Sequence, residues 1–586
     1  MDRRGGLEPA VVAPRASGRA SAEDLTLEIT TPAPPGPHGD PAGAPQETET
    51  ALEPAPLPVA VPAESAGAPG ALAAATPPAA PAAADGGAAA TPPVAPAPAD
   101  GSLDALTASV RRLLSRSWMP LLLLALVCSL SVGARVFQLG KPFEDSPGSG
   151  FIFDEKYYVN AARVIAGVPM QASDPYAQMF TADGAVTSPT GSDQNGEHPQ
   201  LGKVVIAAGI RLLGDNGWGW RFTAVLFGTA TLLLLYWLVR VAGGSSWLAL
   251  GVASLGAVEN LFLISSRIAV LDIYCLPFML AGAAFYLRRQ PVVAGLIFGI
   301  GSCIKEFCAY ALVAMLMVEA GRFLFWAWDE RQRRRQAAIS GEPADAQATG
   351  GETAPRRRID RGAAARRVAI PAVAVLVTVV SYFAVLSMLD RAVPPYHDGH
   401  RVDQNQSQIC SYTLVFQGGC NHFAFMNQYA ASLKGIKGIA SYPWQFWVDV
   451  EQINYYTVTT TVTTGDKVTA VNTVIAFQGM INPVLLALAL PAFAVNLWWA
   501  IRRRDELAML ACAWYVATWL PAQAFNLIGQ RTTYIYYMVV TLPGIFIAVA
   551  RLVGHRRVPR VVLGVWIGLL LAAFAILYPF RTLSGS

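Results

Sequence analysis

Blocks of apolar residues, each long enough to cross a lipid bilayer, constrain this chain more than any other feature of its sequence. The hydrocarbon core of a bilayer is about 30 Å thick, and a helix needs roughly 20 residues to cross it. Hydrophobic residues make up 53% of the 586 residues and charged residues only 14%, and the apolar residues are concentrated in such blocks. This pattern excludes an ordinary soluble enzyme and predicts an all-α polytopic membrane protein.

The apolar blocks predict eleven membrane-spanning helices. Arginines precede the first block and recur in alternate connections, and basic residues collect on the cytoplasmic side of membrane proteins. We therefore expect a cytoplasmic N-terminus and a C-terminus on the outside. The predicted spans lie near residues 118–137, 221–239, 247–264, 268–287, 291–304, 308–327, 368–388, 473–499, 506–522, 533–551 and 560–578.

Residues 1 to about 110 differ in composition from the rest of the chain. They hold 20 of the 41 prolines, and no Phe, Tyr or Trp occurs before Trp118. Such a segment buries too little apolar area to offset the entropy that ordering would cost, so we expect a disordered Ala/Pro-rich cytoplasmic tail. It has no leading apolar stretch and does not resemble a secretory signal peptide. After the tail we expect an N-terminal transmembrane module over 111–388, an outer loop or cap over 389–472, and a C-terminal transmembrane module over 473–586.

The outer connection at 138–219, within the N-terminal module, holds an acidic pair. Asp154 and Glu155 stand side by side among aromatic residues, a few residues after the first apolar block. We predict a helix over 155–166 and an amphipathic helix over 202–213 that lies on the membrane surface. An acidic pair held beside a membrane is where we expect the chemistry of this protein.

Two further connections are long. The cytoplasmic connection at 329–367 is charged and rich in Ala and Gly, and we expect it to be flexible. The outer loop at 389–472 contains a Thr/Val alternation over 457–464, which predicts a short strand or hairpin. Cys410 and Cys420 are the two cysteines outside the apolar blocks, and in an oxidising compartment they are expected to form a disulfide that staples this loop.

His397, His400 and Asp403 offer side chains of the types that bind metals. The further pattern of a metal site is missing around them, and loop histidines are usually solvated. We therefore expect no required metal and no cofactor.

Seven ionisable residues lie inside the predicted spans or at their outer ends. Burying a charge in a bilayer costs a few kcal/mol, so each such residue needs a partner, a water-filled cavity or a function. By the predicted topology all seven lie in the outer half of the membrane, which suggests a cavity open to the outside. They are Arg221, Glu259, Arg267, Asp272, Lys305, Glu306 and Arg531.

Several motifs, taken in their order along the chain, resemble those of the protein O-mannosyltransferases. The resemblance covers roughly residues 118–578, and any one of the motifs alone would be weak. The matching motifs are Phe153-Asp154-Glu155, His198-Pro-Gln-Leu-Gly-Lys203, Trp220-Arg221-Phe222, Ser265-Ser-Arg267-Ile-Ala-Val-Leu-Asp272, Gly479-Met-Ile-Asn-Pro483 and Arg531-Thr-Thr-Tyr-Ile-Tyr-Tyr537.

The resemblance implies a GT-C glycosyltransferase fold with about eleven spans, an active site in the outer loops, and a sugar donor carried on a polyprenyl phosphate. The chain departs from the family at Gln200, where a second proline is common, and this change should loosen a turn without removing a functional group. It also lacks the soluble sugar-binding-like insert of eukaryotic members, which leaves the choice of acceptor open.

By resemblance, and because its loop lies at the membrane interface, Asp154 is assigned as the catalytic base. A carboxylate suits that role, since its charge also supports oxocarbenium-like character at the sugar. The alternative is that Asp154 only caps the helix over 155–166, which is worth about 1 kcal/mol. Glu155 should orient the surroundings of Asp154 or the acceptor through hydrogen bonds.

The leaving phosphate needs cations, and guanidinium groups bind phosphate oxygens bidentately. Arg221 either binds the phosphate or anchors its span at the interface. We expect Asp272 to be an internal partner for an arginine. We expect His198 to be either a turn residue or a hydrogen-bond donor to the phosphate. The sequence leaves open which of the five cations touches the phosphate: Lys203, Arg221, Arg267, Lys305 or Arg531.

These features predict an inverting transferase that moves mannose from a polyprenyl-phosphate carrier to Ser/Thr hydroxyls of exported proteins. One alternative acceptor is a lipid or a cell-wall glycan. Another alternative is a transporter, which inverted repeats would favour, and none is visible. The expected partners are the lipid-linked donor, membrane lipids and an exported protein, with the secretion machinery as a further possibility and no nucleic acid. Composition favours a bacterial plasma membrane.

Overall fold

The computed structural model describes residues 25–28, 116–142, 150–168, 181–182, 185–186, 190–340, 361–404, 410–412, 415–435, 439–449, 452–464 and 467–578. The chain divides into two units, residues 1–34 with 117–586 and residues 35–116. The second unit lies outside the described residues except for Arg116. The predicted disordered tail likewise lies outside them, apart from strand β1 (Leu25–Glu28).

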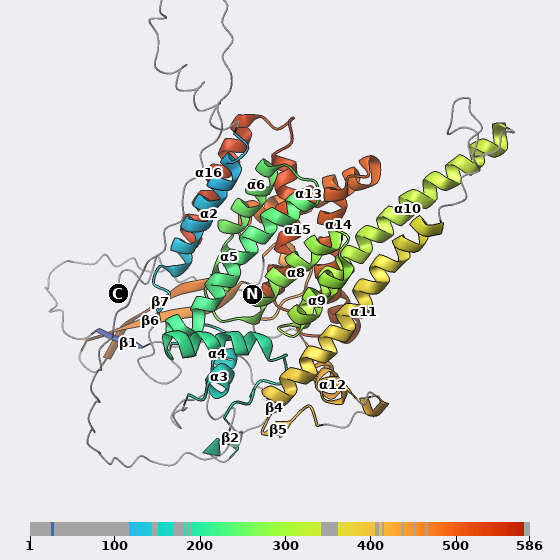
Figure 1. The fold of residues 1–586 in the computed structure, drawn as a ribbon. Helices are drawn as coiled ribbons and strands as arrows, with labels where there is room; N and C mark the ends of the chain where they lie inside the picture. The colour runs from blue at the N-terminus through green and yellow to red at the C-terminus, as the bar shows by residue number, and fades with distance from the viewer. Residues whose placement is uncertain are drawn as a thin grey trace, which may run out of the picture. The chain divides into compact units, whose positions relative to one another are not determined.

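The described part of the larger unit is mostly helical, as predicted (Figure 1). Seven helices contain a stretch long and apolar enough to cross a membrane. They are α2 (Met119–Val136), α5 (Gly217–Val241), α10 (Ala309–Ser340), α11 (Arg361–Ala392), α13 (Pro483–Arg503), α14 (Glu506–Gly529) and α16 (Arg560–Leu577).

Four further apolar helices coincide with predicted spans but have only 12 or 17 residues. They are α6 (Ser246–Ala257), α8 (Leu271–Leu287), α9 (Pro291–Ser302) and α15 (Leu542–Val553). A multi-pass membrane protein is therefore confirmed, whereas the count of eleven spans is not. Short turns extend some of these helices, namely α7 (Asn260–Ser265), η2 (Glu306–Cys308) and η5 (Ile535–Val540).

Capping side chains fix where several of these helices begin. The Asn216 side chain accepts hydrogen bonds from the backbone N–H groups of Trp218 and Gly219 at the start of α5. Ser245 does the same at the start of α6, and Asp505 at the start of α14. Each cap satisfies backbone donors that have no partner within the first turn of a helix.

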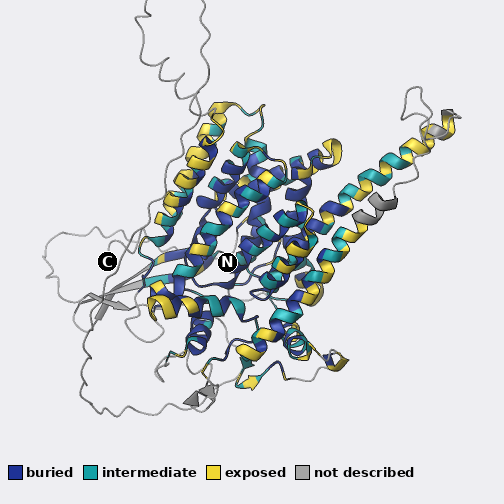
Figure 2. Cartoon of the chain, in the orientation of Figure 1, coloured by how far each residue is buried: buried dark blue, intermediate teal, exposed yellow. Residues whose placement is uncertain are grey.

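Burial separates an inner layer of helices from an outer one. Helix α8 is buried along almost its whole length, between α5 and α9, whereas α16 exposes apolar side chains along most of its surface (Figure 2). Apolar exposure of this extent is expected for helices that face lipid. Helices α10 and α11 reach further than their predicted spans, into the connection that the sequence predicted to be flexible; residues 341–360 of it lie outside the described part.

The predicted outer loops contribute three helices, α3 (Glu155–Ala166), α4 (Leu201–Leu213) and α12 (Gln417–Ser432). The first two match the predicted helices over 155–166 and 202–213. Helix α3 packs on α4, α4 packs on α5, and α12 packs on α11. The remaining short elements are β2 (Thr181–Ala182), β3 (Ala185–Val186), β4 (Tyr396–His397), β5 (His400–Arg401), η3 (Cys410–Tyr412) and η4 (Gln445–Trp447).

The Thr/Val alternation forms a hairpin, as predicted, but a longer one. Strand β6 (Ile453–Thr464) pairs antiparallel with β7 (Lys467–Gly479). The span predicted to begin at residue 473 therefore begins at Pro483, because apolar residues that alternate in a strand resemble the start of a helix. Strand β1 pairs with the other edge of β6, in the order β1-β6-β7. This pairing puts a tail segment beside a loop assigned to the outside, so a cytoplasmic tail stays a prediction.

Candidate active site

Asp154 lies at the start of helix α3, where its side chain makes no capping hydrogen bond. Capping alone therefore does not account for this residue. Its half-buried side chain faces a small pocket between the outer loops and the bundle. The other residues that line this pocket are Phe153, Ser265, Val270, Asp272, Tyr455, Tyr536 and Val539.

Burial raises the pKa of Asp154 from its usual value of 3.8 to about 7, against the opposing effect of Lys305 and Lys156, and the nearby Asp272 raises the pKa further. A general base works best when its pKa lies near the pH at which the reaction runs. Among the residues that the structure describes, no donor forms a hydrogen bond with this carboxylate, so it is available to a substrate hydroxyl.

Glu155, the neighbour of Asp154, is fully buried and serves as an anchor. Its two oxygens accept hydrogen bonds from the backbone N–H of Ile152, at 2.8 Å, and from that of Ala269, at 2.9 Å. They also accept a bidentate pair from Arg221, at 2.8 and 2.7 Å. Glu155 thereby ties the loop before α3 to α5 and to the segment before α8.

Arg221 has no donor left for a phosphate. Besides Glu155, its guanidinium donates to the carbonyl oxygens of Leu139, Lys141 and Gly150, at 3.1, 2.9 and 2.6 Å. These bonds use all five N–H groups of the side chain. Arg221 holds the outer connection together, so the prediction that it binds the phosphate does not fit this geometry.

Arg267 and Lys203 are also engaged in the structure. Arg267 donates to the carbonyl oxygens of Ala134 and Phe137 at the end of α2, at 3.1 and 2.5 Å. Lys203 is fully buried, and its Nζ lies 2.5 Å from the carboxylate of Asp193. Both cations satisfy buried acceptors of the fold.

Asp272 and Lys305 form a buried ion pair, with Nζ at 2.9 and 2.8 Å from the two carboxylate oxygens. The sequence predicted an internal partner for Asp272, but expected an arginine. Lys305 also lies over the rings of Phe307, Tyr536 and Tyr537, at 4.7 to 5.8 Å from their centroids. The pair borders the pocket of Asp154, since Asp272 lines it.

Arg531 differs from the other four cations. Its buried Nε has no hydrogen-bond partner within the described part of the chain, and, as for Arg267, no carboxylate pairs with it there. Its backbone is held by α14, because its N–H donates to Phe525 O at 3.2 Å and its carbonyl accepts from Asn526 at 2.9 Å.

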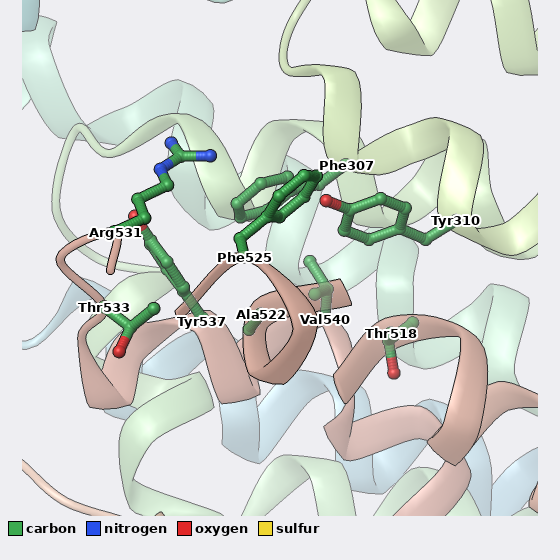
Figure 3. Close-up of a pocket in the computed structure, with 9 residues that line it drawn as sticks. All are labelled: Phe307, Tyr310, Thr518, Ala522, Phe525, Arg531, Thr533, Tyr537 and Val540. Carbon is green, nitrogen blue, oxygen red and sulfur yellow. The ribbon is translucent and has the colours of Figure 1, made fainter. Parts of the chain in front are cut away.

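A second pocket lies beside Arg531, and four of its nine lining residues are aromatic (Figure 3). The residues that line it are Phe307, Tyr310, Thr518, Ala522, Phe525, Arg531, Thr533, Tyr537 and Val540. A guanidinium without a carboxylate, next to apolar rings, suits a ligand that joins a phosphate to a hydrocarbon chain.

His198 is half-buried, and its Nδ1 has no partner among the described residues. Burial, together with the positive charges of Lys305, Lys203 and Arg531, holds its pKa well below the usual value of 6.5. The ring is therefore neutral at physiological pH and can donate one hydrogen bond.

The sequence motifs contain two residues of the aromatic wall of the Asp154 pocket, Phe153 and Tyr536, but they missed the third, Tyr455. Phe153 stacks on Tyr455 with ring centroids 4.3 Å apart, and it meets Tyr536 edge-on at 5.6 Å. The tyrosine clusters in both outer loops were the available signal. Gln200 was predicted only to loosen a turn. In the structure its side chain is fully buried and donates a hydrogen bond to Asp390.

Other expected features of the outer loop can be compared directly. The disulfide between Cys410 and Cys420 is present, as predicted. His397 pairs with Glu197 at 3.1 Å, and Asp403 with Arg401 at 2.6 Å. No group of three His, Cys, Asp or Glu side chains that could hold a metal ion occurs in the described ranges, and the expectation that no metal is required stays a prediction.

Part of the chain is similar to known mannosyltransferases. Residues 190–330 match the family model described as "Dolichyl-phosphate-mannose-protein mannosyltransferase". The polyprenol-phosphate-mannose–protein mannosyltransferase of Mycolicibacterium smegmatis is 27% identical over 161 residues, which is 27% of each chain. The enzyme of the same name from Corynebacterium glutamicum is 33% identical over 93 residues, 16% of this chain and 18% of that one. The alignments thus span about a quarter or less of these relatives' length.

Among solved structures, the S. cerevisiae protein O-mannosyltransferase Pmt1-Pmt2 complex bound to the sugar donor is similar at a TM-score of 0.48. It shares 12% identity, with 81% of this chain and 91% of that chain covered. The matched segment 190–330 contains His198, Lys203, Arg221, Arg267, Asp272 and Lys305. Over this segment, the chain is similar to the dolichyl-phosphate-mannose-protein mannosyltransferases.

Proposed function

We propose that this protein is an inverting glycosyltransferase that moves mannose from a polyprenyl-phosphate carrier to Ser/Thr hydroxyls of exported proteins. One observation carries the proposal: Asp154 is a half-buried carboxylate that accepts no hydrogen bond from the described residues, and burial raises its pKa to about 7. The names of the curated relatives, which specify a polyprenol-phosphate-mannose donor and a protein acceptor, support the choice of substrates.

In the proposed reaction, Asp154 accepts the proton of the acceptor hydroxyl. The hydroxyl oxygen attacks the anomeric carbon of the mannose, and the bond between that carbon and the phosphate oxygen breaks. The attack comes from the face opposite the phosphate, so a single displacement inverts the configuration. The negative charge of Asp154 also stabilises the oxocarbenium-like transition state.

The leaving phosphate takes the electron pair of the broken bond and needs cationic stabilisation. Arg531 is the proposed principal ligand, because its guanidinium has no anionic partner in the described part of the chain. Lys305 supplies a second positive charge, which its pairing with Asp272 partly offsets, and the neutral His198 donates a hydrogen bond. The pocket that Arg531 lines together with four aromatic rings would take the first isoprene units of the carrier.

The proposed setting is the plasma membrane, with the site on the extracytoplasmic face. The carrier then reaches the site within the bilayer, and the acceptor enters from the aqueous side, in the course of export through the secretion machinery. Transfer of mannose from a carrier in the bilayer to an acceptor in water requires the base at the interface between them. Asp154, at the start of α3, is the proposed base.

The test is an in vitro transfer assay with the purified full-length protein, labelled polyprenyl-phosphate-mannose and a Thr-rich peptide from an exported protein. We expect label on the peptide, in the anomeric configuration opposite to that of the donor. Label that appears on lipid or glycan acceptors but not on the peptide would overturn the proposed acceptor, and retention of configuration would overturn the single displacement.

A further inference from the structure

Gln200, Asp390 and His422 come together in a buried polar network far from one another in sequence. Gln200 Nε2 donates to Asp390 Oδ1 at 2.7 Å and approaches the carbonyl oxygen of Val393 at 3.2 Å. His422 Nδ1 lies 2.8 Å from the same Asp390 Oδ1, and its Nε2 lies 2.9 Å from the carbonyl oxygen of Gly196. The three residues are at most 1% exposed.

The network joins three parts of the fold. Asp390 belongs to the last turns of α11, His422 to α12 of the outer loop, and Gln200 ends the loop that precedes α4. His422 Nε2 faces a carbonyl oxygen, which can only accept, so Nε2 donates there. The ring therefore bridges α11 to the loop at Gly196, while Gln200 ties the end of that loop to the same carboxylate.

The loop held in this way carries His198, midway between Gly196 and Gln200. Its backbone is fixed on other sides as well: Lys203 Nζ donates to His198 O at 2.9 Å, and Gly196 N–H donates to Tyr396 O at 2.9 Å. In contrast, the His198 ring has a buried Nδ1 without a partner in the described part. The backbone of His198 is thus held at several points, while its ring nitrogen is left without a partner in the described part. This arrangement is expected of a residue that is kept in place for a ligand.

We propose that Gln200, Asp390 and His422 are positioning residues that hold the His198 ring at the donor phosphate. The role of His198 rests on the proposed function; the hold on the loop does not. A buried carboxylate and histidine that only filled space would be costly to desolvate, and apolar residues of similar shape would serve as well. The network instead fixes one loop, the one that carries His198. The positive charges of Lys305 and Arg531 lie near enough to His198 to lower its pKa.

The first test measures the loop without reference to activity. Gln200→Leu keeps the approximate size of the side chain and removes both N–H donors of its amide. Asp390→Asn keeps the shape of the side chain that Gln200 and His422 share. In full-length protein in detergent, we expect each variant to speed hydrogen exchange of the amides over residues 193–198 by about tenfold or more. The matched control Gln428→Leu, on the exposed face of α12, should leave the exchange unchanged.

The second test asks whether the network acts through His198. We expect Gln200→Leu to lower kcat/KM for the donor about tenfold, mainly by raising KM, and to cause little further loss when combined with His198→Ala. Losses that multiply in the double variant, or unchanged exchange over residues 193–198, would overturn the proposal. If the wild-type protein transfers no mannose, the proposed function fails, and the exchange measurement still decides whether the network holds the loop.

Discussion

Asp154 and Glu155 are adjacent in the sequence, yet their carboxylates have opposite roles in the structure. Glu155 accepts four hydrogen bonds and is fully buried, whereas Asp154 accepts none from the described residues and faces a pocket. Successive residues of a helix point about 100° apart, so one turns inward to Arg221 and the other toward the pocket. The same acidic dipeptide thus supplies an anchor and a proposed base.

The pKa of Asp154 predicts how activity depends on pH. Only the ionised carboxylate can accept a proton, and burial puts its pKa at about 7 in the free protein. We therefore expect kcat/KM to fall about tenfold per pH unit well below pH 7 and to level off above about pH 8. A profile measured with the peptide acceptor checks this; a limb near pH 4 would show that the carboxylate is not desolvated.

Two arginines that look equivalent in the sequence should respond differently to substitution. Arg221→Gln leaves Glu155 buried without its counter-charge, so we expect a loss of about 3–5 kcal/mol in stability. Arg531→Gln removes a guanidinium that pairs with no carboxylate in the described part, so stability should change by less than about 1 kcal/mol. Its donor KM should instead rise about tenfold or more, because a charged hydrogen bond is lost.

Thermal unfolding and donor titrations of the two variants measure these effects side by side. The opposite pattern, with a stable Arg221→Gln and an unfolded Arg531→Gln, would reverse the roles assigned to the two residues.

At the residue scale, the sequence predicted which residues gather but not what each one contacts. Asp154 and Asp272, which belong to two of the motifs, line one pocket in the structure, and Asp272 pairs there with Lys305. The motifs could not show that all five N–H groups of Arg221 donate to Glu155 and to three carbonyl groups. The carbonyl groups belong to a loop whose path is set by tertiary packing. Gln200 was read as a turn position for the same reason, since its partner is 190 residues away.

At the scale of elements, close helix packing depends on small residues. A Cβ at Gly299 in α9 would lie 2.8 Å from the carbonyl oxygen of Thr378 in α11 and would also meet the Ser381 side chain. Because backbone cannot easily move away, we expect Gly299→Ala to destabilise the protein by about 1–3 kcal/mol.

Gly251→Ala, in α6, is the matched control, since nothing lies within 4 Å of the added Cβ. It should raise stability by about 0.5–1 kcal/mol through helix propensity alone. Thermal unfolding of both variants checks the pair. Equal effects would mean that α9 and α11 do not pack as the structure shows.

Helix positions were predictable because apolar length and caps are local properties of the sequence. Helices α3 and α4 follow the predicted ranges to within one residue. The hairpin β6–β7 was only partly predicted, since its second strand is held by cross-strand pairing and its apolar residues run directly into α13.

At the scale of the whole molecule, the direction of the chain through the membrane follows from its charges and can be tested with cysteines. The five free cysteines are buried and the other two form a disulfide, so an introduced thiol should react alone. A membrane-impermeant maleimide added to intact cells should label Gln428→Cys, in α12, and should not label Arg335→Cys, at the exposed end of α10. The reverse pattern would put the proposed active site on the cytoplasmic face.

The central claim is that the carboxylate of Asp154 takes the proton of the acceptor hydroxyl. Its most direct test is the rate of mannose transfer to the peptide by Asp154→Asn beside the wild type, with thermal unfolding of both. We expect the rate to fall about 10²- to 10⁴-fold, as for the loss of a general base. The unfolding temperature should stay the same, because the side chain caps no helix. Near-normal turnover in a folded Asp154→Asn protein would contradict the account.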